Sequence, residues 1–229
     1  MKEFLKNNAL FFSLWILTFI LLGIAMCVIP KAELHLQMNA CHNYVFDVFF
    51  KSFTIIAEYG LFVLVFILLF IKVGPTIYLT VCGLSSTIIV QIIKHIVNAP
   101  RPKLFFESIG SFDMLPIVEG VNMHNHHSFP SGHTTTFFVI FGGLSVILTY
   151  WLCKNNKNNW AYFLQFICFG LAVLGAYSRI YLSQHFAADV FAGSCIAMVC
   201  LIAWYPLFGW LAQKHNRLFN YKIPIGKQK

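Results

Sequence analysis

Six apolar runs, each close to the length of a membrane-spanning helix, divide this chain of 229 residues. A helix needs about 20 apolar residues to cross a hydrocarbon core about 30 Å thick. In lipid every backbone polar group must be hydrogen-bonded within the protein, which a helix achieves by itself. The sequence therefore predicts an all-α, polytopic membrane protein with six transmembrane helices. The runs cover residues 9–29, 53–72, 76–97, 132–152, 160–178 and 186–211.

The composition agrees with a chain that lies mostly in lipid. Hydrophobic residues make up 59% and charged residues 10%, whereas a soluble domain carries roughly 25% charged residues. The run at 9–29 follows Lys2 and Lys6 as in a signal peptide, but it is too long for one and no small-residue cleavage site follows it. We therefore expect a retained helix within a single membrane domain, residues 1–229.

The seven cysteines indicate neither a disulfide framework nor a metal site. Only Cys41 falls in a clear loop, and no pair has the C-x-x-C spacing. The other six occupy apolar runs or their edges, where a thiol packs as a small apolar group. They are Cys27, Cys82, Cys153, Cys168, Cys195 and Cys200.

The basic residues set the expected orientation, because cytoplasmic loops carry the excess of lysine and arginine. With the N-terminus inside, the inner side holds Lys2, Lys6, Lys72, Lys154, Lys157, Lys214, Arg217, Lys222, Lys227 and Lys229. The outer side then holds Lys31, Lys51, Lys94, Arg101, Lys103 and Arg179. This count favours cytoplasmic termini. Because the basic residues report topology, the net charge of +8 is not interpreted as a nucleic-acid site.

Two connections on the outer side are long. In the loop 30–52, spaced apolar residues predict short helices at the membrane interface. The loop 98–131 mixes turn residues with apolar ones and is unusually long for a compact protein. It is interpreted either as a lid or lipid-entry surface or as an ordinary interfacial loop.

Ionisable residues inside membrane spans are costly and mark candidate functional sites. Those of this chain are Glu58, Lys94, His95, Arg179, His185 and Asp189. All of them fall near the outer ends of their spans, as do Arg101, Ser131 and His133. Three separate segments thus deliver polar side chains to the same depth on the same side.

The first segment carries two cations at the end of the third span. Lys94 and Arg101 lie about two helical turns apart, but Pro100 and Pro102 favour a helix end near Asn98. Both cations then point into one region. Long basic side chains also snorkel to the interface at helix ends without any function.

The second segment, Pro130-Ser131-Gly132-His133, precedes the fourth span. Ser131 is a good N-cap, and the free N–H groups of a helix start also bind anions. Gly132 lets the backbone approach such an anion closely, and His133 exchanges a proton near neutral pH.

The third segment places His185 and Asp189 four positions apart at the start of the sixth span, so they face the same way. A carboxylate bound to one imidazole nitrogen leaves the other as a nucleophile. A buried structural pair would look alike, but it would not explain Arg179 at the end of the neighbouring span. Three cations suit a phosphate dianion, and two histidines suit its covalent transfer.

The complete pattern resembles the three-part motif of the type 2 phosphatidic acid phosphatase (PAP2) superfamily. Its parts are Lys94-x6-Arg101-Pro102, Pro130-Ser131-Gly132-His133 and Ser178-Arg179-x5-His185-x3-Asp189. All three are intact, in order and correctly spaced. The resemblance implies a membrane-bound lipid phosphatase with a PAP2/haloperoxidase-like helical core.

The resemblance also implies a role for each motif residue. His185 would attack phosphorus and form a phosphohistidine, Asp189 would orient it, and His133 would protonate the leaving group and later activate water. The groups that would hold the phosphate oxygens are Lys94, Arg101, Arg179, Ser131 and the Gly132 amide. The resemblance implies no metal and no cofactor.

The motif leaves several polar residues unexplained. Glu58 would either face the site and tune a base, or bond Tyr59 or a backbone group. Asn98 and His95 flank the cations and are candidates for a supporting layer. His124, His126 and His127 precede the Pro-Ser-Gly-His turn, where metal binding, headgroup contact and simple exposure are the alternatives.

The leading hypothesis is therefore a metal-independent lipid phosphatase or pyrophosphatase in a bacterial inner membrane, with its site facing the periplasm. Undecaprenyl pyrophosphate, a phosphatidate-type lipid and lipid A are the candidate substrates. One alternative is a vanadate-dependent haloperoxidase-like enzyme, although those relatives are soluble. The other is a non-enzymatic protein that binds or transports a lipid phosphate, which would need the cations but not two histidines.

Overall fold

The computed structural model describes residues 2–221. All regular elements in this range are helical, and six helical segments are long and apolar enough to cross a membrane. These segments are α2 (Ala9–Val28), α4 (Tyr44–Phe53) with η1 (Ile56–Gly60) and α5 (Leu61–Ile71), α6 (Val73–Val97), α8 (Gly132–Lys154), α9 (Asn158–Tyr181) and α10 (Ala187–Lys214). The shorter elements are α1 (Lys2–Asn7), α3 (Lys31–Met38), α7 (Pro102–Ser108), η2 (Phe112–Met114) and α11 (Asn216–Phe219). The prediction of a six-helix, all-α membrane protein is confirmed.

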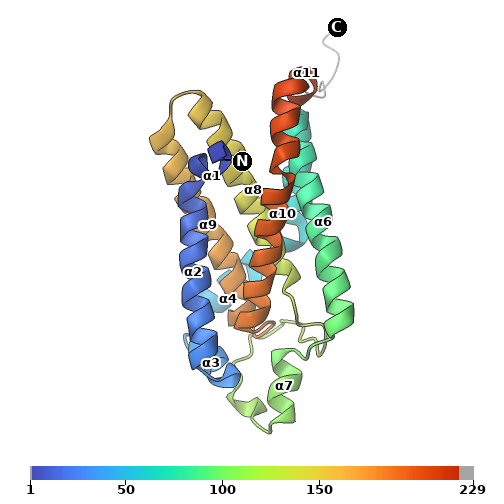
Figure 1. Cartoon of the computed structure of the whole chain (residues 1–229). Helices are drawn as coiled ribbons and strands as arrows, with labels where there is room; N and C mark the ends of the chain where they lie inside the picture. Colours follow the sequence, from blue (N-terminus) through green and yellow to red (C-terminus); the bar gives the residue numbers. More distant parts are fainter. Residues whose placement is uncertain (1, 222–229) are drawn as a thin grey trace.

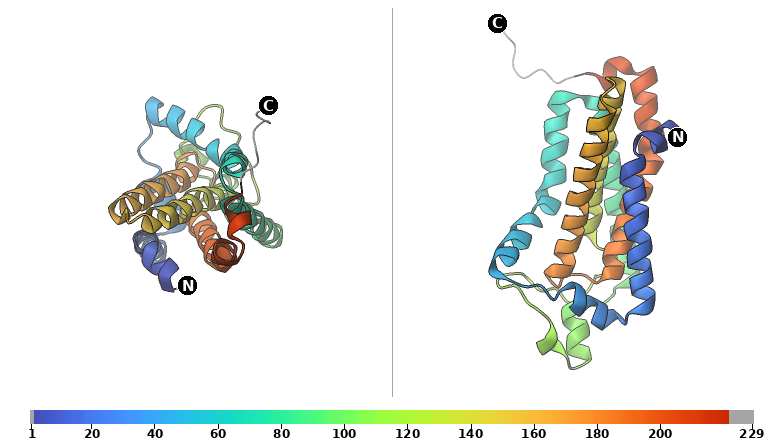
Figure 2. Two further views of the ribbon diagram at one scale, coloured as in Figure 1. Left: turned by 90° about the horizontal axis from the view of Figure 1, so that it is seen from above. Right: turned by 90° about the vertical axis from the view of Figure 1, so that its left-hand side faces the viewer.

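The bundle is built around α8, the most buried of the six segments. It packs against α9, α10 and α6, while α2 covers α9 and α10 on one side and α5 covers α6 on another (Figures 1 and 2). Apolar side chains fill this core, and they also cover its outside. Leu17, Phe62 and Phe166 are each more than half exposed. An apolar exterior of this extent fits lipid, so the chain is an integral membrane protein.

The two long connections lie at one end of the bundle, together with α3 and α7, and this end is called the site end below (Figure 1). α1 and α11 lie towards the other end. Of the short helices predicted in the first long connection, one is present as α3. Three of the lysines counted for the expected orientation lie outside the described residues, namely Lys222, Lys227 and Lys229. The two ends of the predicted domain also lie outside them.

The start of the second span differs from its prediction at residue 53. The helical segment begins at Tyr44, where the Asn43 side chain accepts a hydrogen bond from Phe46 N (2.9 Å). No proline interrupts the chain from there to Ile71, so α4, η1 and α5 follow one another directly. α4 leans away from the bundle axis and packs on α9 (Figure 2, right). The π-helical turn η1 lies at the bend and carries Glu58.

Candidate active site

Arg179 is the most deeply buried cation at the site end. It lies in the last turn of α9 with 6% of its surface exposed, and its Nη1 donates to Thr54 Oγ1 at 2.6 Å. Its Nε is buried and has no acceptor among the described residues, which also place no carboxylate within 4.0 Å of the guanidinium. A buried charge without a counter-ion is unfavourable unless an anion binds beside it.

Arg101 is held in place by two segments of chain. It precedes α7, and 9% of its surface is exposed. Its Nε donates to the His126 carbonyl at 3.0 Å, and its Nη1 donates to Gln184 Oε1 at 3.0 Å. These contacts tie the guanidinium to the loop before α8 and to the loop before α10, so it is fixed before any ligand binds.

The start of α8 contributes backbone groups and approaches a third cation. Ser131 caps this helix, and its own N–H donates to the Asp189 carbonyl at 2.9 Å. A Cβ at Gly193 would lie 2.5 Å from the Ser131 carbonyl oxygen, so the close approach of α10 to α8 requires glycine there. A Cβ at Gly132 would lie 4.0 Å from Lys94 Nζ. The Lys94 ammonium therefore lies beside the positive end of the α8 dipole, where an anion is favoured.

His185 and Asp189 form a buried pair at the start of α10. His185 is 1% exposed, and its Nδ1 lies 3.4 Å from Asp189 Oδ2. The same oxygen accepts from Phe186 N at 2.9 Å and from Ser128 Oγ at 2.5 Å. Burial lowers the pKa of His185 below its usual range although Asp189 acts in the opposite direction, so the ring is neutral at pH 7. With Nδ1–H directed at Asp189, Nε2 keeps a free lone pair.

His133 lies in the first turn of α8 and faces η1. Its Nε2 is 3.6 Å from Glu58 Oε1. Helical turns of the π type are rare and frequently occur at functional sites. Here the turn directs a carboxylate at the imidazole, so Glu58 faces the site. His133 also lies within electrostatic range of His185 and Arg179.

A cavity of about 350 Å³, called the site cavity below, opens beside these groups. Its lining residues are Lys51, Thr54, Ile55, Glu58, Arg101, Gly120, Val121, Asn122, His124, His133, Arg179, Leu182 and Gln184. His185 and Asp189 are not among them and lie buried nearby. The cavity thus combines a candidate acid–base histidine with two guanidinium groups.

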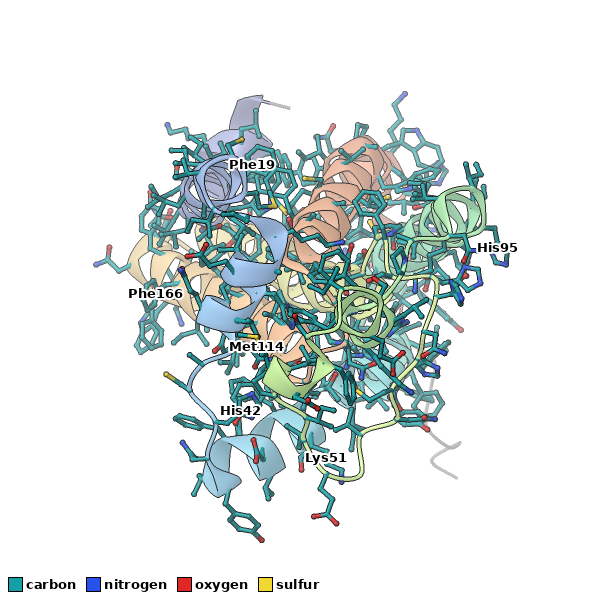
Figure 3. All side chains as sticks on the ribbon, turned by 90° about the horizontal axis from the view of Figure 1, so that it is seen from below. Phe19, His42, Lys51, His95, Met114 and Phe166 are labelled. Carbon is teal, nitrogen blue, oxygen red and sulfur yellow. The ribbon has the colours of Figure 1, made fainter. Side chains whose placement is uncertain are left out.

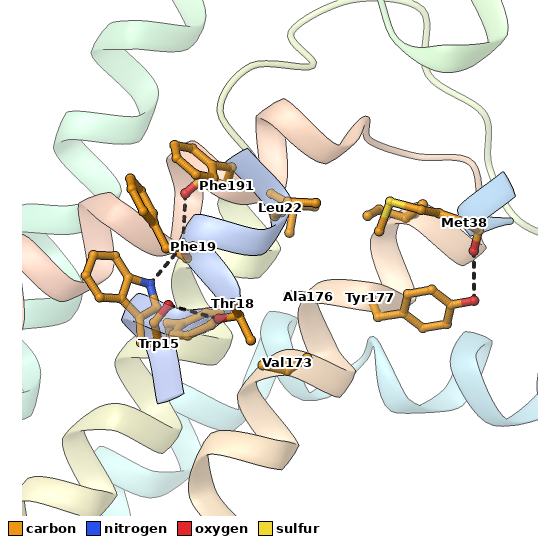
Figure 4. A pocket seen from close by; sticks show the side chains of 13 residues that line it. Trp15, Thr18, Phe19, Leu22, Met38, Val173, Ala176, Tyr177 and Phe191 are labelled. Atoms are coloured by element: carbon orange, nitrogen blue, oxygen red, sulfur yellow. Dashed lines mark hydrogen bonds between the residues drawn. The ribbon is translucent and has the colours of Figure 1, made fainter. Parts of the chain in front are cut away.

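A second cavity of about 130 Å³ has a different chemistry (Figure 4). It lies where α2, α9 and α10 meet, and Trp15 Nε1 donates to Ser194 Oγ there at 3.2 Å. At its other end the Tyr177 hydroxyl donates to the Met38 carbonyl at 2.9 Å. None of the described lining residues is a lysine, arginine, histidine or carboxylate, so this cavity offers no phosphate site.

Comparison with known proteins places this arrangement in a family. The model of the PAP2 superfamily matches residues 75–213, which include all three parts of the motif. The chain belongs to the PAP2 superfamily. The structure of LpxE from Aquifex aeolicus is similar at 29% sequence identity and a TM-score of 0.60, over 77% of this chain and 94% of that one. No curated protein matches the sequence.

The superfamily match, the likeness to LpxE and the six apolar helices together identify the chain as a membrane-bound lipid phosphatase, a phosphoric ester hydrolase. The structure brings the three motif parts together at the site end, as their spacing indicates. The pair expected at the start of the sixth span is divided by the helix boundary: His185 lies just before α10, which begins at Ala187, and Asp189 lies in its first turn. Asn98 does not line the site cavity and instead ends α6 in a left-handed conformation, with φ of 42°.

Several PAP2-site contacts involve residues that the sequence pattern did not single out. Thr54 accepts from Arg179, Gln184 accepts from Arg101 and Ser128 donates to Asp189. Gln184 and Ser128 lie close in sequence to motif residues, which is a weak signal. Thr54 carries no signal, because a threonine at the edge of an apolar run is ordinary.

Replacing Ser128 with alanine is expected to lower kcat for lipid-phosphate hydrolysis about tenfold or more. Ser128 is 0% exposed and gives Asp189 one of its three hydrogen bonds, and a bond to a charged group contributes about 1.5–3 kcal/mol. Phosphate release by the purified variant measures the effect. Ser108→Ala is the matched control, because within the described chain its hydroxyl donates to the Phe105 carbonyl of its own helix and contacts no motif residue. Parental kcat in Ser128→Ala would show that the contact does not orient Asp189.

Proposed function

We propose that this protein hydrolyses a phosphate monoester or diphosphate of a membrane lipid through a phosphohistidine on His185. The observation that carries the proposal is the buried Arg179 guanidinium, whose Nε has no acceptor in the described chain. The guanidinium lies beside that of Arg101 and near His133 and His185. A tetrahedral dianion offers oxygens to several donors at once, so phosphate fits this set better than a carboxylate does.

In the first step, Nε2 of His185 attacks phosphorus and forms a P–N bond. The bond from phosphorus to the leaving oxygen breaks, and that oxygen takes a proton from His133. Asp189 stabilises the positive charge that develops on His185 through the Nδ1 contact. The guanidinium groups, Lys94 and the start of α8 stabilise the charge on the three remaining phosphate oxygens.

In the second step, a water molecule attacks the phosphohistidine. His133, now neutral, takes a proton from that water, and the P–N bond breaks with its electron pair returning to Nε2. Inorganic phosphate leaves, and both histidines regain their starting states. The chain supplies positive charge at every stage from side chains and helix N–H groups. We therefore infer that the reaction is independent of metal ions.

We propose that the protein lies in a bacterial inner membrane with the site facing the periplasm, and the distribution of its basic residues supports the orientation. Ten of them fall on the side of the termini in the predicted topology, against six on the site side. Of those six, Lys94, Arg101 and Arg179 lie in the phosphate site. With these three explained by the phosphate site, the excess of lysine and arginine on the side of the termini favours cytoplasmic termini.

A panel of lipid phosphates tests the proposal. Purified protein in detergent with EDTA is offered phosphatidate, phosphatidylglycerol phosphate, undecaprenyl pyrophosphate and lipid A, and released phosphate is measured. We expect release from at least one lipid, and radiolabelled phosphate that is acid-labile and base-stable on the protein after rapid quenching. If the protein hydrolyses none of these lipids, the proposed function is refuted. Activity that EDTA abolishes would refute the metal-independent mechanism.

A further inference from the structure

The cations that line the site cavity lie at two depths. Arg101 and Arg179 are both buried, whereas Lys51 is exposed at the cavity mouth. Lys51 lies on α4, on the same helical face as Ile55 and Glu58, which also line the cavity. The three-part motif does not include Lys51, and the two reaction steps above do not use it.

One hydrogen bond holds the Lys51 ammonium at this position, and one glycine leaves room for it. Its Nζ donates to the Glu119 carbonyl at 3.0 Å, beside the loop that follows η2 (Figure 3). The next residue, Gly120, has φ of +71°, and a Cβ there would lie 2.5 Å from Lys51 Nζ. A glycine is therefore needed both for the backbone conformation and for the approach of the ammonium.

The charge of Lys51 is not neutralised by the described chain. Among the side chains that the structure describes, in residues 4–221, no carboxylate oxygen lies within 4.0 Å of its Nζ. Among the described lining residues the single carboxylate is Glu58, which faces His133. The carbonyl contact leaves two of the three ammonium protons free for another acceptor.

The position of Lys51 relative to the inner cations follows from the helix. Thr54, which accepts from Arg179, lies three residues further along the chain, or about 4.5 Å along the axis. His124 also lines the cavity, and burial followed by the charges of Arg101, Arg179 and Lys94 lowers its pKa. The positive field of the inner cations thus extends to His124 in the cavity lining.

We propose that Lys51, placed by the Glu119 carbonyl over Gly120, forms an outer subsite for a second phosphate group of the substrate. This inference rests on the proposed function and adds to it a residue that would favour substrates with two phosphates over those with one. The second group is either bridged to the transferred phosphate, as in a diphosphate, or attached elsewhere on the headgroup. In a diphosphate, the bond from the transferred phosphorus to the bridging oxygen breaks, and that oxygen takes the His133 proton. Lys51 then holds the departing lipid monophosphate.

The test compares Lys51→Met with the parental enzyme on farnesyl diphosphate, farnesyl monophosphate and a lipid that carries two separate phosphates. Methionine keeps the length of the lysine stem but removes its charge. We expect the ratio of kcat/KM for the diphosphate to that for the monophosphate to fall about tenfold, since one charge-assisted hydrogen bond is lost. Lys103→Met, at the same end but outside the site cavity, is the matched control and should keep the parental ratio.

Each outcome decides between the alternatives. A fall confined to the diphosphate supports a bridged second phosphate, and a fall confined to the other lipid supports a separate one. An unchanged ratio for both in a folded Lys51→Met variant overturns the subsite while leaving the phosphatase intact. If the parental enzyme hydrolyses none of the three lipids and none of the wider panel, the proposed function itself is refuted.

Inhibition by inorganic ions provides a second measurement that does not depend on the lipid. Inorganic diphosphate should inhibit the parental enzyme more strongly than inorganic phosphate. In Lys51→Met the inhibition constant of diphosphate should rise about tenfold relative to that of phosphate. Equal changes for the two ions would contradict an outer subsite.

Discussion

His185→Ala is expected to lower kcat for lipid-phosphate hydrolysis by at least about 10⁴-fold, because it removes the nucleophile. The ring is 1% exposed and neutral, and its Nδ1 faces Asp189 at 3.4 Å. No other described histidine has a buried carboxylate partner of this kind. His42 also contacts a carboxylate, Asp47, but both of those side chains are partly exposed. A substitute nucleophile is therefore not available at the same position.

The measurement is phosphate release from the best lipid of the panel, with radiolabelled substrate used to detect phosphate on the protein. The variant should show neither turnover nor label. His95→Ala is the matched control, since His95 is exposed at the same end, does not line the site cavity, and its Nδ1 lies 2.8 Å from the Gln91 carbonyl oxygen. Parental turnover in folded His185→Ala would assign the nucleophile to another group.

The parts of this site that could be predicted from the sequence depend on local geometry. The end of α6 at Val97 follows from Pro100 and Pro102, and the start of α8 follows from Ser131. The polar residues within apolar runs were informative for a thermodynamic reason, because a charge in a membrane span is retained only where something compensates for it. That argument located the site at one end of the bundle before any tertiary contact was known.

The contacts that complete the site could not be predicted in this way, because they join residues far apart in sequence. Thr54 and Arg179 are separated by 125 positions, and Ser128 and Asp189 by 61. Serine and threonine are common at helix ends, where their usual partner is the local backbone. Their pairing with a distant charge depends on how the helices pack. The bend at η1, which directs Glu58 at His133, has the same origin.

His133→Ala is expected to lower kcat about 10²- to 10⁴-fold, as the loss of a general acid–base group usually does. His133 acts twice in the proposed reaction, but the demand on it differs between the steps. An alkoxide-like leaving group needs a proton from His133, whereas a nitrophenolate leaves without one. The variant should therefore form the phosphohistidine quickly from para-nitrophenyl phosphate and slowly from a lipid phosphate.

This difference makes the second role of His133 observable. With para-nitrophenyl phosphate, hydrolysis of the phosphohistidine still needs a base to take the proton from water, so His133→Ala should accumulate phosphate on His185. Rapid mixing should show a burst of nitrophenolate close to one equivalent per enzyme, followed by slow turnover. His133→Ala combined with His185→Ala should show no burst. A single slow phase without label would mean that His133 is needed only for the transfer of phosphate to His185 and not for the later hydrolysis. Unchanged kinetics would remove His133 from the reaction.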